Sequence, residues 1–171
     1  MNAKCKSCNL HLLRRNIVGL RGSFDADILF VTEAPSKSDV LRRQLLCGNN
    51  SKLLQNLFND SGLYKNGIPW AITSILKCRP CDTFSGDTRD PHPEEVLACA
   101  KHFLYDAHKV NPKGVVFFGK LTAKYYKNEF PNSITLVHPS FVVRTGGVAS
   151  PHYPSMVRLL EDFVDEIKEK K

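Results

Sequence analysis

The 171-residue chain has the composition of a folded globular protein, because 42% of its residues are hydrophobic and 24% are charged. No uninterrupted apolar run approaches the length of a membrane-spanning helix, and the first residues lack the apolar stretch of a secretory signal, so we expect a cytoplasmic protein without a membrane partner. Lysine and arginine number 24 against 17 acidic residues, and the resulting charge of +7 favours a polyanionic partner, nucleic acid first.

Strand-like and helix-like segments alternate along the chain. Apolar runs rich in β-branched and aromatic residues predict strands over residues 26–32, 70–76, 114–118 and 134–137. Apolar residues at helical spacing predict helices over residues 52–58, 93–110, 121–126 and 153–170. This alternation is typical of an α/β fold with a parallel sheet covered on both faces. No linker or repeat divides the chain, so residues 1–171 are expected to form a single domain.

Three of the loops that follow predicted strands carry unusual motifs. The first reads TEAPSKSD from residue 32 and continues to LLCG from residue 45, the second reads KCRP from residue 77, and the last reads HPSFVVR from residue 138. Parallel strands end at the same edge of a sheet, where functional residues gather, so these motifs are expected to meet. An imidazole and carboxylates brought together there suit acid–base and electrostatic catalysis.

The cysteines form a second pattern. Six thiols in a reducing compartment favour a metal or cluster over disulfides. Cys5 and Cys8 have the spacing of a chelating pair, and Cys78 and Cys99 lie far along the chain. Four such thiolates suit either zinc or an iron–sulfur cluster, and spacing alone does not separate the two. A set of unrelated buried thiols is the alternative.

Together these motifs resemble those of the family 4 uracil-DNA glycosylases, which carry GEAPG, KCRP and HPS motifs in this order. The resemblance covers most of the chain, from about Cys5 to Arg144. It implies a three-layer α/β/α sandwich with a short four-stranded parallel sheet. We expect a monomer whose partner is single- or double-stranded DNA, and a replication or repair protein is a further candidate partner.

The resemblance also implies a cofactor. It assigns a [4Fe–4S] cluster to four cysteines, Cys5, Cys8, Cys78 and Cys99. Cys47 and Cys81 are then spare, although Cys81, three residues beyond Cys78, is an alternative ligand. The competing interpretation is a four-cysteine zinc protein on an unrelated α/β domain.

The chemistry expected of such a protein is the removal of a base from DNA. A glycosylase extrudes the nucleotide into a pocket, and bond cleavage places positive charge on the sugar and negative charge on the departing base. We expect His138 to stabilise the base, while Glu33 and Asp39 hold the water and offset the charge of the sugar. By resemblance, Glu33 matches the motif glutamate and Asp39 stands where the family has a second glutamate. A structural cap of the following turn is the alternative role for Glu33.

The remaining site residues are expected around the base and the DNA strand. The base pocket is predicted to include Pro35, Ser36, Leu46 and Ser74. The DNA-facing loop is predicted to include Ser140 and Arg144, which hold phosphates, and Phe141, an apolar wedge for the gap left by the flipped base.

Several of these residues depart from the family pattern. Leu46 stands where the family has an aromatic ring, and Ser74 stands where it has an asparagine. Thr32 and Ser36 replace two motif glycines. Because the leucine and the serine are smaller than the residues they replace, the sequence predicts an altered base preference or reduced activity, with room for a larger modified pyrimidine.

Two functions from different classes therefore follow from the sequence. The first is a DNA glycosylase of the base-excision repair type, which hydrolyses the N-glycosidic bond of a flipped uracil or related modified pyrimidine. The alternative is a catalytically impaired glycosylase-like module that binds DNA or a protein partner without chemistry. Cleavage of uracil-containing oligonucleotides separates the two.

Overall fold

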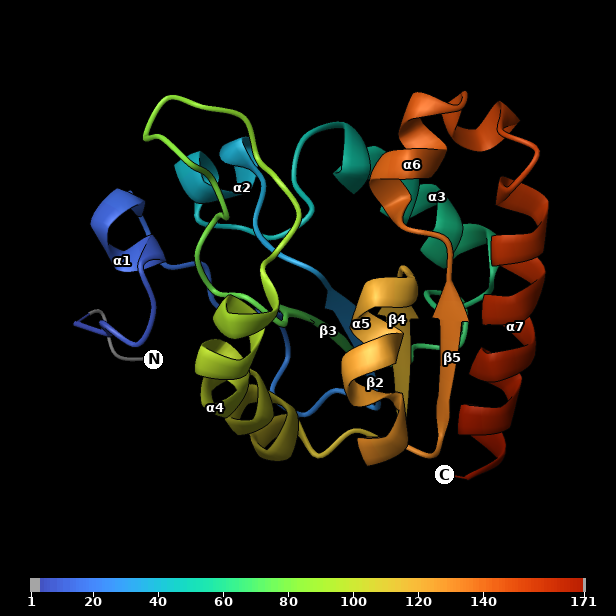
Figure 1. Cartoon of the computed structure of the whole chain (residues 1–171). Helices are drawn as coiled ribbons and strands as arrows, with labels where there is room; N and C mark the ends of the chain where they lie inside the picture. The colour runs from blue at the N-terminus through green and yellow to red at the C-terminus, as the bar shows by residue number, and fades with distance from the viewer. Residues whose placement is uncertain (1–3, 171) are drawn as a thin grey trace.

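The computed structural model describes residues 4–170, and its strands form one sheet with the order β1-β3-β2-β4-β5 (Figure 1). Four strands run parallel: β2 (Ile28–Thr32), β3 (Trp70–Ser74), β4 (Gly114–Phe118) and β5 (Ser133–Leu136). The short strand β1 (Arg21–Gly22) pairs antiparallel with β3 at the edge. The sheet is therefore mixed and has one strand more than predicted. Strand β1 was not predicted, because its two residues are too few to show an alternation of apolar side chains.

The helices lie between and around these strands. They are α1 (Leu10–Leu13), α2 (Lys37–Arg42), α3 (Asn49–Asp60), α4 (Pro93–Val110), α5 (Lys120–Tyr126), α6 (Pro139–Arg144) and α7 (Tyr153–Glu169). The four predicted helices correspond to α3, α4, α5 and α7. The other three escaped prediction because segments of four to six residues are too short to show helical periodicity.

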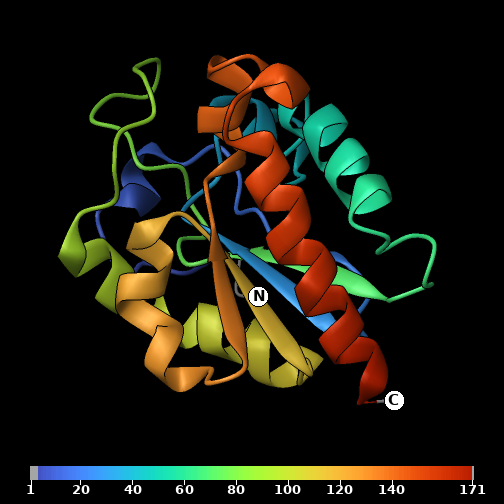
Figure 2. The same ribbon diagram turned by 90° about the vertical axis from the view of Figure 1, so that its right-hand side faces the viewer.

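Each face of the sheet has its own core. Alternate residues of β2 point in opposite directions, so that Ile28 and Phe30 pack with residues of α3 and α7, whereas Leu29 and Val31 pack with residues of α4 and α5. Figures 1 and 2 show these helix pairs on opposite sides of the sheet. The arrangement confirms the predicted three-layer α/β/α sandwich.

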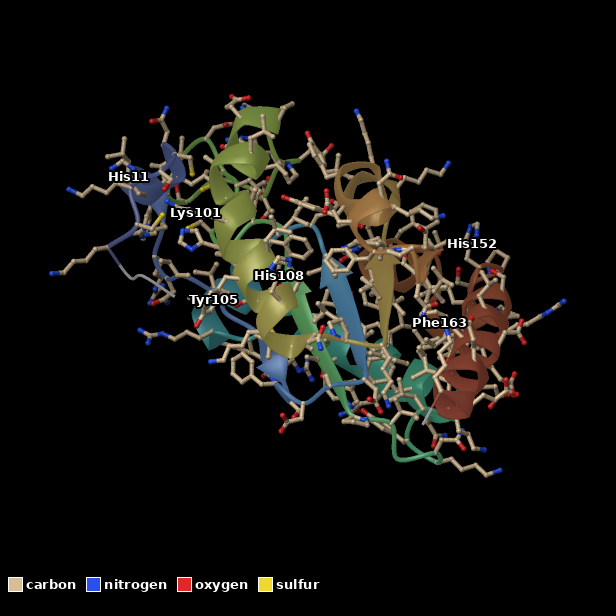
Figure 3. The ribbon with its side chains drawn as sticks, turned by 90° about the horizontal axis from the view of Figure 1, so that it is seen from below. His11, Lys101, Tyr105, His108, His152 and Phe163 are labelled. Atoms are coloured by element: carbon tan, nitrogen blue, oxygen red, sulfur yellow. The ribbon has the colours of Figure 1, made fainter. Side chains whose placement is uncertain are left out.

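The packing of α7 depends on a glycine in the sheet. A Cβ atom on Gly114 would lie 2.5 Å from the ring of Phe163, so glycine leaves the space that this ring fills. Figure 3 shows Phe163 projecting from α7. Among residues 4–170, no helix is both long enough and apolar enough to span a bilayer.

The carboxyl ends of the parallel strands meet at the upper edge of the sheet in Figure 1, where α2, α6 and the long green loop before α4 gather. The backbone N–H groups of Ile75 and Leu76 donate to the carbonyls of Thr32 and Glu33, which continues the pairing of β2 and β3 into their loops. The three predicted motifs are therefore brought to one edge of the molecule.

Candidate active site

An open cleft of about 420 Å³ lies at this edge. Its walls come from the loop after β2, the loop before α4 and the start of α6. The lining residues are Glu33, Ala34, Ser36, Thr88, Arg89, Asp90, Pro91, His138, Ser140, Phe141 and Arg144.

Glu33 and His138 approach each other across a glycine. Gly119 has a φ of +91°, and a Cβ atom there would lie 2.9 Å from Oε1 of Glu33 and 3.7 Å from Cβ of His138. The carboxylate of Glu33 and the Cβ of His138 therefore lie around the same small residue, at the end of β4. Sequence reasoning did not single out Gly119, because a glycine that follows a strand carries no chemistry of its own.

Glu33 lies in a partly buried position on the cleft wall. Burial raises the pKa of its carboxyl group above the ordinary value, and the negative charge of Asp90 raises it further. A carboxylate with a raised pKa binds a proton more readily, so the position of Glu33 strengthens its side chain as a base.

His138 is held by hydrogen bonds on both ring nitrogens. It caps the N-terminus of α6, where Nδ1 accepts a hydrogen bond from the backbone N–H of Ser140 at 3.2 Å. Nε2 lies 2.9 Å from Oγ1 of Thr32. Burial lowers the pKa of His138 to about 4, and the charge of Arg144 acts in the same direction. The ring is therefore neutral at pH 7, and because Nδ1 accepts, the hydrogen bonds assign its proton to Nε2.

Asp39 has a structural role as a helix cap. The sequence analysis had considered such a cap as the alternative role of Glu33. Its Oδ2 accepts the backbone N–H of Ser36 and its Oδ1 accepts that of Cys47, both at 2.9 Å. The side chain is buried and forms a capping box at the start of α2. Asp39 thus ties the loop after β2 to the segment that precedes α3, and it does not line the cleft.

Three of the predicted base-pocket residues are buried and do not line the cleft. Leu46 is 3% exposed and has a φ of +50°, which is uncommon for leucine. Ser74 is fully buried, and its hydroxyl donates to the carbonyl of Leu76 at 2.6 Å. Pro35 is buried as well, so Ser36 is the predicted pocket residue that reaches the cleft.

The predicted DNA-facing residues form one turn of helix at the cleft rim. Phe141 is 40% exposed and Arg144 is exposed, whereas the intervening Val142 is fully buried in the core. The hydroxyl of Ser140 accepts a hydrogen bond from Nδ2 of Asn50, which joins α6 to α3. The ring of Phe141 and the guanidinium of Arg144 are therefore exposed on a helix that a hydrogen bond joins to α3.

The loop before α4, which forms the opposite wall, is fastened by arginines. Arg89 makes a bidentate pair with Glu95 at 2.7 and 3.0 Å and a further hydrogen bond to Asp82 at 2.7 Å. The guanidinium of Arg79 donates to the carbonyls of Phe84 and Gly86. These contacts were not predicted, because hydrogen bonds of single arginine side chains leave no periodic signal in the sequence.

The four predicted cluster cysteines line one small pocket of about 20 Å³ below the loop after β3. The lining of that pocket also includes Lys77 and His102, and Nε2 of His102 lies 3.3 Å from Sγ of Cys5. Figure 3 shows His11 of α1 and Lys101 of α4 beside this region. Cys47 and Cys81 are buried outside it.

The thiols suit a soft metal centre by their type and number. Burial raises the pKa of Cys78 to about 11 and also raises the pKa of Cys99. The neighbouring thiols of the pocket raise both pKa values further. As the side chains of residues 4–170 stand, no three His, Cys, Asp or Glu groups are close enough to hold a metal ion.

Comparisons with known proteins show which family this chain is similar to. The family described as the Uracil DNA glycosylase superfamily matches residues 21–162. A Type-4 uracil-DNA glycosylase of Thermotoga maritima is 31% identical over 167 residues, which cover 96% of this chain and 82% of that protein. One of Archaeoglobus fulgidus is 32% identical over 133 residues, covering 78% and 63%, and one of Saccharolobus solfataricus is 31% identical over 123 residues, covering 71% and 54%. The chain thus spans between about half and four-fifths of these relatives.

Proposed function

The chain belongs to the uracil DNA glycosylase superfamily, and on that premise we propose that it hydrolyses the N-glycosidic bond of a flipped uracil or related modified pyrimidine in DNA. The observation that carries the proposal is the approach of Glu33 and His138 around Gly119 on the wall of one open cleft. The basic charge of +7 supports DNA as the partner.

The proposed mechanism divides the developing charges between two side chains. Glu33, ionised, holds the attacking water and offsets the positive charge that grows on the sugar. His138, neutral with its proton on Nε2, donates a hydrogen bond to O2 of the departing base and stabilises its negative charge. The neutral imidazole can fill this role because it still carries an N–H on Nε2 and needs no further proton to donate. Asp39 acts through the loop that it caps, as a positioning residue.

The proposed contacts with DNA lie on α6. Arg144 and Ser140 hold phosphates, and the exposed ring of Phe141 fills the gap that the flipped base leaves in the stack. Leu46 and Ser74 are buried and do not line the cleft. Because neither is an aromatic ring or an amide, we propose that the site discriminates less firmly among pyrimidines than a site that stacks and reads the base.

We further propose that Cys5, Cys8, Cys78 and Cys99 hold a [4Fe–4S] cluster. The support is that all four line a single pocket, and that Thermotoga and Archaeoglobus proteins of the same type are similar to this chain. When bound, the cluster supplies covalent links among the N-terminal segment, the loop after β3 and α4. Zinc is the alternative occupant of four thiolates.

A DNA-binding module without chemistry is the second candidate function. It is favoured by the burial of Leu46 and Ser74 away from the cleft lining and by the hydrogen bond that already engages Nε2 of His138. That the chain acts as a monomer, and that a replication or repair protein is a further partner, stay predictions.

Single-turnover cleavage of oligonucleotides tests the proposed function. Single- and double-stranded substrates that carry uracil, 5-substituted uracils or cytosine are incubated with the protein, and alkali then cuts abasic sites. We expect cleavage at uracil or a substituted uracil, with a loss of about 10²-fold or more in Glu33→Gln and in His138→Ala.

The control is Glu161→Gln, which removes an exposed carboxylate of α7 and leaves cleavage unchanged. Salt-sensitive DNA binding without cleavage of any pyrimidine would select the binding module instead.

A further inference from the structure

We propose that Thr32 is a positioning residue that restrains His138 in the resting site, by holding the ring proton that the departing base needs. The proposal rests on the proposed function of His138. It gives a role to a residue that the sequence analysis noted only as the replacement of a motif glycine.

The contact is direct and well formed. Oγ1 of Thr32 lies 2.9 Å from Nε2 of His138, within the range of a good hydrogen bond. Nδ1 of the ring accepts the backbone N–H of Ser140, and an amide nitrogen of this kind can only donate. The neutral ring therefore carries its proton on Nε2, and that proton is donated to the threonine hydroxyl.

The position of Thr32 makes this contact a restraint and excludes a relay to the substrate. Thr32 ends β2, is 1% exposed and does not line the cleft, whereas His138 does. The hydroxyl thus cannot itself reach a base in the cleft. Both ring nitrogens are engaged in the resting site, so Nε2–H must leave Thr32 before it can donate to O2 of the base.

The energetic consequence follows from which state the hydrogen bond stabilises. The bond is present before the base arrives and is lost when Nε2–H turns to the departing base. An interaction that is stronger in the ground state than in the transition state slows the reaction. Because one hydrogen bond of this kind contributes roughly 0.5–1.5 kcal/mol net, its removal corresponds to an increase of about two- to tenfold in the rate.

Thr32→Val tests the restraint, because valine has nearly the same shape and is equally suited to a strand but cannot accept a hydrogen bond. We expect single-turnover cleavage to rise about two- to tenfold in Thr32→Val. Thr32→Ser keeps the hydroxyl and is expected to stay near the parent rate. Thr135→Val, the same change on β5 outside the cleft lining, serves as the matched control. Where the parent protein cleaves, a parent-like or lower rate in Thr32→Val, or an equal rise in Thr32→Ser, overturns the proposal.

A second measurement does not depend on cleavage. In ¹H–¹⁵N spectra of the imidazole side chains, His138→Gln identifies the His138 signals. We expect the Nε2 resonance to move in Thr32→Val and in the smaller Thr32→Ala, and to stay in place in Thr32→Ser. An unmoved resonance in both overturns the proposal even if the protein cleaves DNA. A moved resonance in a protein that cleaves no pyrimidine supports the restraint and counts against the proposed function alone.

Discussion

At the scale of single residues, the site depends on two side chains whose charge states are shifted in opposite senses. Burial makes Glu33 easier to protonate and His138 harder to protonate. His138 stays neutral down to about pH 4, so it does not set the acid side of the activity profile. Glu33 acts as a carboxylate, and activity is therefore lost as the pH falls through its raised pKa.

This reasoning predicts the effect of removing the neighbouring charge. Asp90→Asn takes away the negative charge that raises the pKa of Glu33, so the pKa falls towards its ordinary value and the acid limb of kcat/KM moves to lower pH. Asp87→Asn, on the same loop, is the matched control and is expected to leave the limb in place. An acid limb at the same pH in Asp90→Asn would mean that Glu33 is not the group that titrates.

At the scale of elements, periodicity explains what the sequence could and could not predict. The boundaries of α4 and β4 were predicted to the residue, because long apolar repeats and a favourable first turn mark them. Buried polar contacts leave no such pattern. The sequence analysis noted Lys77 only as part of the KCRP motif. In the structure, Nζ of its buried side chain lies 2.8 Å from Oδ2 of Asp106, and the same oxygen accepts a hydrogen bond from the hydroxyl of Thr73. The carboxylate of Asp106 therefore ties α4 to β3 through Thr73 and to the loop after β3 through Lys77.

The tie between α4 and β3 is expected to be sensitive to the loss of one partner. Asp106→Ala leaves the Lys77 ammonium buried and unpaired, and we expect the free energy of unfolding in urea to fall by roughly 3–5 kcal/mol. Asp162→Ala, at an exposed position of α7, is expected to change it by less than about 0.5 kcal/mol.

The double variant Lys77→Met, Asp106→Leu is expected to recover most of the loss, because no unpaired charge then remains in the interior. If the double variant is as unstable as Asp106→Ala, the loss comes from packing and the ion pair is not its cause.

At the scale of the whole molecule, the sequence predicted which loops would meet but not how their side chains would face. Parallel strands bring the carboxyl ends of β2 and β5 to the same edge of the sheet. The sequence alone therefore predicted that Glu33 and His138 lie near each other. The orientation of Asp39 and Ser74 depends on local backbone amides and carbonyls, which no motif encodes. That residues 1–171 form a single domain stays a prediction.

The cysteine pocket joins three segments that lie far apart in the sequence, and its proposed cluster can be tested by exchanging one thiol at a time. We expect the purified protein to be brown, and Cys78→Ser to lose both the visible absorption and bound iron. Its melting temperature should also fall, because metal binding free energy adds to folding free energy. Cys81→Ser and Cys47→Ser change buried thiols outside the pocket and are the matched controls, with absorption and iron retained. A colourless parent protein that contains zinc would replace the cluster with a zinc site, and loss of iron in Cys81→Ser would move the fourth ligand to that residue.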